Sequence, residues 1–332
     1  MRLSKNIKIF LNYFLGPLLF AWLSWSLYMQ IKHQPDLDNA WRKISESFGS
    51  VRLWRFVAVI LLMVVNWSIE AYKWKISISK IQKISFLKSL RAILSGVSFS
   101  VSTPNRIGEY FGRVLYMDDG NRLKTISITI VGSISQLLIT LVMGFIGLLM
   151  LRSEIEANNI VSAIWMRMII YGVLTVLTGL TLFYFRLSWM VKWIDRIPGS
   201  SKFAYLIRAL EEFDATLLLK LLSLSLLRFI VFIVQYYLLF QLFVVDISWW
   251  QAFWAVSVSF LVMAVIPTIA IAELAQRGKV TTTIVGLYSI NELGMTFATI
   301  GIWAINLILP AIIGSILILG IKKIYKEKNE GT

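Results

Sequence analysis

Two short motifs place a proline before the pattern Glu-x-x-x-Arg inside otherwise apolar sequence. The first joins Pro104 to the pair Glu109–Arg113, and the second joins Pro267 to the pair Glu273–Arg277. In each pair the acid comes first and the base follows four residues later, so on a helix they share one face and can form an ion pair. Because a charge in an apolar segment is costly without a partner, such residues indicate a functional site in membrane proteins.

The first motif also has the features of an anion site. Proline disfavours helix at the residue before it, so a helix is expected to start just after Pro104. The N-terminus of that helix would point toward the membrane interior, with N–H groups and partial positive charge that suit a phosphate. Arg106 and Arg113 would add cations, Gly108 would allow close backbone approach, and Glu109 would compensate these cations or an amine on the substrate.

Other polar residues occur singly in apolar runs. Arg228 has no acid nearby in sequence and is expected to meet Glu109, Glu273 or a lipid phosphate. The pair Glu70–Lys73 is expected at the edge of a basic loop, and Glu292 lies early in the last apolar run. The candidate substrate-binding residues are Thr103, Pro104, Asn105, Arg106, Gly108, Glu109, Arg113, Arg228, Pro267, Glu273, Arg277 and Glu292.

The composition excludes several classes of protein. Of the 332 residues, 58% are hydrophobic and 15% charged, whereas a soluble domain has about 25% charged residues. A soluble enzyme and a disordered chain are therefore excluded. The chain has no cysteine and one histidine, His33, which excludes disulfides, thiol catalysis and a multi-histidine metal site. We expect no cofactor and no metal.

The apolar runs predict an all-α polytopic membrane protein. A run of about 20 residues crosses roughly 30 Å of hydrocarbon, and two further runs, 86–118 and 249–282, are each interrupted near a proline. We expect one membrane domain over 1–332, with six full spans, two re-entrant helical hairpins and two cytoplasmic amphipathic helices over 186–215. The six predicted spans are 7–31, 52–72, 124–151, 160–185, 216–244 and 288–321.

The basic residues predict the orientation. The formal net charge is +15, and Lys and Arg gather in the cytoplasmic loops of membrane proteins. The segments assigned to the inside hold 23 of the 33 Lys and Arg residues. Both termini are therefore expected in the cytoplasm, in the cell (inner) membrane. This distribution explains the charge without a nucleic acid partner.

The two interrupted runs resemble each other. Residues 84–88 align with 247–251 at an offset of 163, as Pro104 does with Pro267, and Glu109 aligns with Glu273 at 164. We interpret 52–151 and 216–321 as two repeats. The first hairpin would enter from the cytoplasm and the second from outside, so the repeats would be inverted, as in many secondary transporters.

The stretch from Ser102 to Glu109 resembles the transmembrane domain of the lysylphosphatidylglycerol synthase/flippase family, as does the later stretch from Pro267 to Glu273. Asn105 stands where that family usually has glycine, and residues 269–272 replace a Gly-rich run. The resemblance implies translocation of an anionic or aminoacylated phospholipid, or a lipid-linked headgroup, between leaflets. The soluble synthase domain of bifunctional members has no counterpart in 322–332, so we expect no enzymatic activity.

Two rival functions follow from the same pattern. A membrane enzyme would need a nucleophile, a metal cluster or a sugar-nucleotide site, and the sequence offers none. An accessory or scaffold protein would bind a lipid- or glycan-modifying enzyme in the membrane. The expected partners are the bilayer and a phospholipid, and either a homo-oligomer or a complex with a lipid-modifying enzyme is compatible with the sequence.

Overall fold

The computed structural model describes 53–101, 103, 107–186, 213–266 and 270–318, with single positions between 25 and 49. This part of the chain consists of helices joined by turns, without a strand. Of the first predicted span, 7–31, only two residues are described. The amphipathic helices expected over 186–215 fall almost wholly outside the described residues, as does the basic segment 322–332.

Five helical segments are long and apolar enough to cross a membrane. At 1.5 Å per residue, even the shortest of them, with 23 residues, reaches beyond the roughly 30 Å of the hydrocarbon core. Five of the six predicted spans therefore correspond to helices of the length and apolar composition that a membrane span needs. They are α4 (Leu53–Ile78), α7 (Arg122–Met150), α9 (Ala163–Phe185), α12 (Ala215–Leu242) and the segment Glu292–Ile318, which contains α15 (Glu292–Trp303) and the π-helical turn η5 (Ala304–Ile308).

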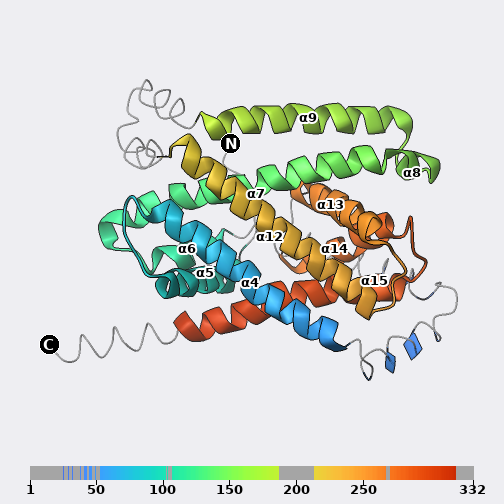
Figure 1. The fold of residues 1–332 in the computed structure, drawn as a ribbon, viewed down its shortest axis with the longest axis horizontal. Coiled ribbons are helices and arrows are strands. Elements are labelled where there is room, and N and C mark those ends of the chain that lie inside the picture. Colours follow the sequence, from blue (N-terminus) through green and yellow to red (C-terminus); the bar gives the residue numbers. More distant parts are fainter. Residues whose placement is uncertain are drawn as a thin grey trace, which may run out of the picture. The chain divides into compact units, whose positions relative to one another are not determined.

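Each interrupted run forms two helices, as predicted (Figure 1). The first pair is α5 (Phe86–Val101) with α6 (Gly108–Val114), and the second is α13 (Trp249–Val265) with α14 (Ala270–Val285). The longest of the four has 17 residues, about 25 Å of helix, which falls short of the hydrocarbon core. The helix expected just after Pro104 begins only at Gly108, whose N–H donates to the side chain of Thr103.

The order of the elements repeats along the chain. A long helix, two short helices and another long helical segment occur in this order in α4, α5, α6 and α7, and again in α12, α13, α14 and the segment Glu292–Ile318. Adding 163 to the bounds of α4 gives 216–241, and adding it to those of α5 gives 249–264. These values lie within one residue of the observed bounds of α12 and α13, which supports an internal duplication.

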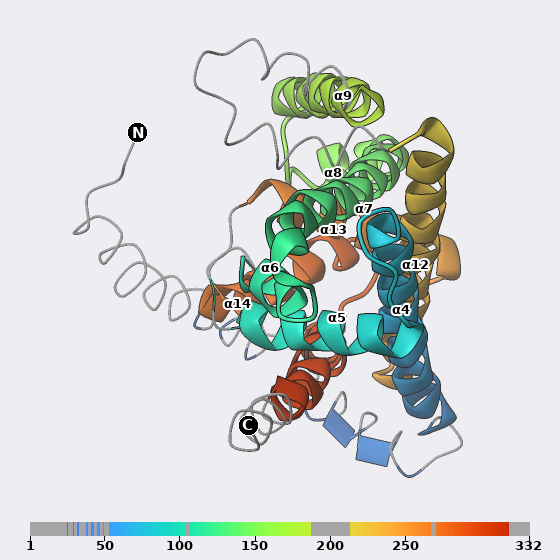
Figure 2. The same ribbon diagram turned by 90° about the vertical axis from the view of Figure 1, so that its left-hand side faces the viewer.

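The described chain divides into two compact units. The first unit comprises 1–62, 140–174 and 232–305, and the second comprises 63–139, 175–231 and 306–332. In the first, α14 packs against α13 and α15, and Gly147 of α7 faces the backbone of Trp254 on α13. In the second, α5 and α6 lie side by side (Figures 1 and 2).

Glycine allows the close approach of α5 and α6. A Cβ atom at Gly96 would lie 2.8 Å from the backbone oxygen of Glu109, and one at Gly112 would meet the backbone of Gly96. Small residues allow the same kind of close backbone contact between membrane helices. Since α6 has only 7 residues, its position depends on this contact.

We expect Gly112→Ala to destabilise the α5–α6 hairpin by about 1–3 kcal/mol, the usual cost of forcing extra volume into a packed interior. The free energy of unfolding of the purified protein in detergent measures the effect. Gly172→Ala on α9 is the matched control, because a Cβ atom there meets nothing within 4 Å. Equal stability of the two variants would show that the close contact is not required.

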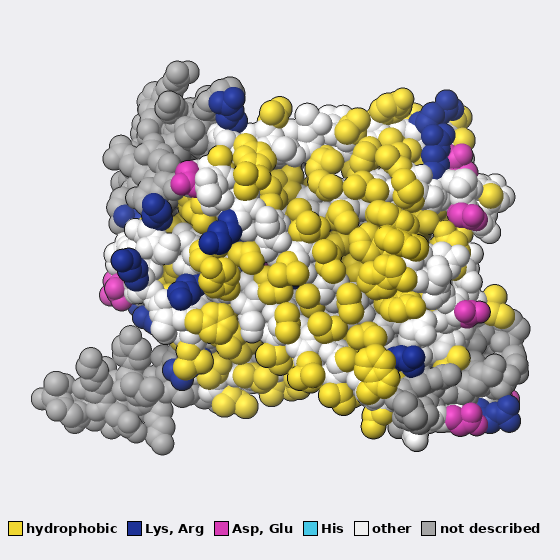
Figure 3. All heavy atoms as spheres, viewed as in Figure 1, with side chains coloured by type: hydrophobic (Ala, Val, Ile, Leu, Met, Phe, Trp, Pro, Cys, Tyr) yellow, Lys and Arg dark blue, Asp and Glu magenta, His cyan; other side chains and the backbone are white. Residues whose placement is uncertain are grey.

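Apolar side chains cover the outer surfaces of the long helices. Leu61 on α4 and Leu227 on α12 are exposed, and Figure 3 shows hydrophobic side chains gathered over these helices. On α9 almost the whole helix surface is exposed and apolar. Exposed apolar surface of this extent is what lipid-facing helices present.

Candidate functional site

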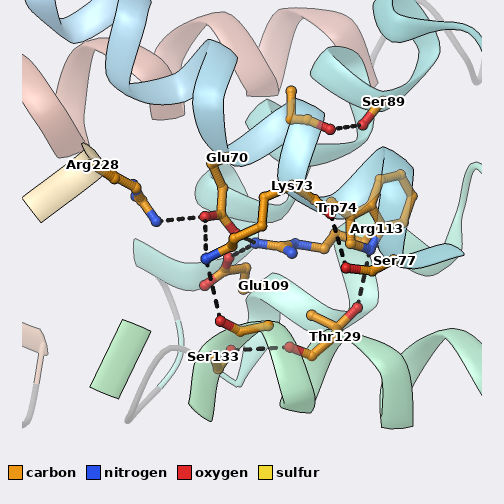
Figure 4. A network of polar contacts seen from close by, with 12 residues as sticks. Glu70, Lys73, Trp74, Ser77, Ser89, Glu109, Arg113, Thr129, Ser133 and Arg228 are labelled. Atoms are coloured by element: carbon orange, nitrogen blue, oxygen red, sulfur yellow. Dashed lines mark hydrogen bonds and ion pairs between the residues drawn. The ribbon is translucent and has the colours of Figure 1, made fainter. Parts of the chain in front are cut away.

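Five charged side chains meet in the second unit around Glu70 of α4 (Figure 4). One carboxylate oxygen, Oε2, lies 2.9 Å from Nζ of Lys73 and 2.7 Å from NH1 of Arg228. The other, Oε1, lies 3.1 Å from NH2 of Arg113, and the same NH2 group pairs with Glu109. We call these five residues the Glu70 cluster.

Three helices contribute to the Glu70 cluster. Glu70 and Lys73 are one turn apart on α4, a spacing that places both on one helix face. Arg228 comes from α12. Glu109 and Arg113 come from α6, which the glycine contact with α5 holds in place. The hairpin therefore brings its own ion pair to a carboxylate on a membrane-spanning helix.

The Glu70 cluster is buried and carries an excess of positive charge. The side chains of Lys73 and Arg113 are each 2% exposed and that of Glu70 is 6% exposed, whereas Arg228 and Glu109 reach 13% and 26%. Buried charges are stable only when paired, and here three cations face two carboxylates. One positive charge is thus left over within this set of residues.

Neutral polar groups complete the surroundings. Lys73 donates to the backbone oxygen of Gly132 at 3.2 Å and to the hydroxyl of Ser225 at 3.3 Å. Arg228 donates through Nε to Asn66 at 2.7 Å, and Asn66 donates to Asn306 in η5. A π-helical turn often marks a functional position, and here it supplies a polar group to α4.

Arg228 also contacts an aromatic ring. Its Cζ atom lies 5.0 Å from the ring centroid of Trp67, within the range of a cation–π interaction. Near the same hairpin, the hydroxyls of Tyr116 and Ser95 share a hydrogen bond of 2.9 Å. Burial raises the pKa of Tyr116 above its usual value, so this phenol stays protonated at neutral pH.

The second hairpin carries a smaller ion pair in the first unit. Arg277 donates to Glu273 at 2.7 Å through NH2 and at 3.0 Å through Nε. Arg277 also interacts with the hydroxyl of Tyr236 on α12. The repeat offset of 163 aligns Lys73 with Tyr236. The first hairpin therefore has a buried cation near its ion pair at the position where the second hairpin has a neutral hydroxyl. The charges of the Glu273–Arg277 pair balance.

The structure confirms the two predicted ion pairs, Glu109–Arg113 and Glu273–Arg277. Arg228 on α12 faces α4, where it contacts Glu70 and Asn66; the prediction had named Glu109, Glu273 or a lipid phosphate as its partner, and Glu70 was not among them. Glu70 pairs with Lys73, as their spacing predicts, and it also binds two arginines, Arg113 and Arg228. The feature of the sequence that could have indicated a larger role for Glu70 is its position within an apolar run.

Three further predictions concern the helix termini and the prolines. The first N–H of α6 donates to Oγ1 of Thr103 at 2.7 Å, so this group is not free for the phosphate that we expected there. Glu292 begins α15, where a carboxylate stabilises the positive end of the helix dipole. The predicted site residues outside the described part of the chain are Pro104, Asn105, Arg106 and Pro267.

The site offers charge and hydrogen bonds for binding. Among the residues that the structure describes, no group of three or more acidic or histidine side chains could hold a metal ion. Comparison with known proteins gives one family: a model described as the lysylphosphatidylglycerol synthase TM region matches residues 13–314. No curated protein matches the chain.

Proposed function

Since the chain belongs to the family of the lysylphosphatidylglycerol synthase TM region, we propose that it moves a phospholipid, anionic or aminoacylated, or a lipid-linked headgroup between the two leaflets of the cell membrane. The observation that carries this proposal is the Glu70 cluster, a buried and net positive set of side chains on membrane helices. A phosphate-bearing headgroup is the natural counter-charge for such a set.

A headgroup that crosses the bilayer needs a polar path. Transfer of a charged group through hydrocarbon is costly, and irregular backbone at membrane depth survives only against protein or a water-filled cavity. We propose that the two hairpins are re-entrant and enter from opposite faces, as the sequence repeat suggests. The Glu70 cluster would then hold the headgroup while the acyl chains stay in lipid.

The driving force in this proposal comes from the headgroup's own charge. The membrane potential acts on a translocated charge with about 2.3 kcal/mol per 100 mV. Such a bias is enough to direct exchange between leaflets without a chemical step. We therefore propose a transporter that needs no cofactor.

Reconstitution into liposomes tests this function. The purified protein is expected to speed the movement of a fluorescently labelled phosphatidylglycerol from the inner to the outer leaflet, measured by dithionite quenching. A chemically altered lipid would contradict the proposal and favour an enzyme. A lipid that is neither moved nor altered would also contradict the proposal, and this result would favour the accessory or scaffold protein.

We expect Glu109→Gln to slow this movement about tenfold. The change removes the second carboxylate from Arg113, and a more positive cluster would release an anionic headgroup slowly, at about 1.4 kcal/mol for a factor of ten. Glu156→Gln is the matched control, because Glu156 forms an exposed ion pair with Arg152 on the short helix α8 (Arg152–Ala157). Full activity of the Glu109→Gln variant would show that Glu109 is not part of the headgroup site.

A further inference from the structure

We propose that the Glu70 cluster selects headgroups with one net negative charge and disfavours the lysyl ester of phosphatidylglycerol. This inference rests on the proposed function, because it takes the cluster as the headgroup site. It concerns the substrate class: a phosphodiester monoanion, such as the headgroup of phosphatidylglycerol, rather than a headgroup whose amines outnumber its phosphate.

The first argument for this selectivity is the net charge of the cluster. Three cations and two carboxylates give these five side chains together a net charge of +1, and each of them is at most 26% exposed. A phosphodiester carries one negative charge and would neutralise the set. A lysyl ester adds two amines to the same phosphodiester, so with both amines protonated its headgroup is net positive and would be repelled.

The second argument, which concerns the phosphate group, comes from two buried hydrogen-bond donors that lack an acceptor in the described part of the chain. Nε of Arg113 and the indole Nε1 of Trp67 are buried and have no acceptor among the residues that the structure describes. Arg113 is 2% exposed and Trp67 is 7% exposed. Because an unpaired buried donor is costly, a ligand rich in hydrogen-bond acceptors would stabilise both groups. Phosphate oxygens are such acceptors. Both headgroups offer them, so these donors indicate a phosphate ligand, whereas the charge of the cluster accounts for the selectivity.

The exposed members of the cluster indicate which side chains a headgroup would meet. Arg228 and Glu109 are more exposed than the other three members. Of the two carboxylates in the cluster, that of Glu109 is the more exposed to an incoming amine, and it is already paired with Arg113. A second amine would add a positive charge to a cluster that already has more cations than carboxylates.

Competition binding tests the selectivity. Purified protein in nanodiscs of phosphatidylcholine would bind a fluorescent short-chain phosphatidylglycerol, and the competitors would be unlabelled phosphatidylglycerol, lysylphosphatidylglycerol and the water-soluble phosphodiester glycerophosphoglycerol. We expect phosphatidylglycerol to displace the probe at about tenfold lower concentration than the lysyl ester, because close unit charges near a protein surface interact strongly. Displacement by glycerophosphoglycerol at similar concentrations would identify the phosphodiester, without the acyl chains, as the bound group.

Two variants shift the balance in opposite directions. Arg228→Gln should weaken binding of phosphatidylglycerol about tenfold, whereas Glu109→Gln should tighten it by a similar factor. Tighter binding cannot result from a misfolded protein, so the second variant keeps the test decisive if the first fails to fold. Arg152→Gln removes the same charge from an exposed ion pair and should change nothing.

The outcomes separate this inference from the proposed function. Equal or tighter binding of the lysyl ester, or weaker binding of phosphatidylglycerol to a folded Glu109→Gln variant, overturns the selectivity. Transport of the lysyl ester in liposomes together with such binding would leave the proposed function standing. Selective binding of phosphatidylglycerol without transport would overturn the function and leave the selectivity standing.

Discussion

The variant Glu70→Gln should abolish lipid movement, with a loss of at least about 100-fold in the rate of dithionite-accessible exchange. Glu70 binds Lys73, Arg113 and Arg228 at once, and glutamine keeps the shape of the side chain but not its charge. Removing one partner from a buried charge set typically costs about 3–5 kcal/mol, because the remaining charges stay buried without compensation. Thermal unfolding in detergent measures this loss beside the transport rate.

The matched control for Glu70→Gln is Glu156→Gln. Glu156 also loses an arginine partner, Arg152, but this pair lies at the surface, where ion pairs contribute about 0–1 kcal/mol. The control should keep both stability and transport. Wild-type transport by a stable Glu70→Gln variant would show that the Glu70 cluster is not part of the translocation path.

The second large effect is expected for Arg277→Gln, which should destabilise the protein by about 3 kcal/mol. Glu273 is 8% exposed and receives two hydrogen bonds from Arg277, so this change leaves a buried carboxylate without its cation. The midpoint of thermal unfolding in detergent measures the effect.

A double-mutant cycle checks the origin of that loss. The double variant Glu273→Gln/Arg277→Gln removes both charges and should recover most of the stability, because no unpaired charge remains. A double variant as unstable as Arg277→Gln alone would show that Arg277 acts through packing rather than through its charge.

Much of the fold follows from the sequence, because membrane spans depend on length and apolar content. The apolar runs located five of the long helices, and Pro104 and Pro267 located the two interruptions. The ends differ by several residues. The helix α4 extends to Ile78 rather than to residue 72, and Lys73, which lies beyond the predicted end, is buried and donates to Gly132 of α7 and Ser225 of α12. Local sequence cannot show that a lysine is accommodated by tertiary contacts.

The ion pairs within one helix were predictable and those between helices were not. Glu109 and Arg113 are four residues apart, so helix geometry alone brings them together. Arg228 and Glu70 are separated by 158 positions, and nothing in a single sequence distinguishes this partner from Glu109 or Glu273. The central position of Glu70 follows from the packing of α4 against α6 and α12.

The absence of cysteine in the sequence allows a direct test of the inverted, re-entrant hairpins. Each variant would carry one thiol at an exposed position flanking a hairpin: Lys83→Cys and Asp119→Cys for the first, and Asp246→Cys and Ile290→Cys for the second. A membrane-impermeant maleimide added to intact cells reports the outer face, and inside-out vesicles report the cytoplasmic face. We predict that the first two thiols react only from the cytoplasm and the last two only from outside. Labelling of all four from one face, or of Lys83→Cys and Asp119→Cys from opposite faces, would contradict the account.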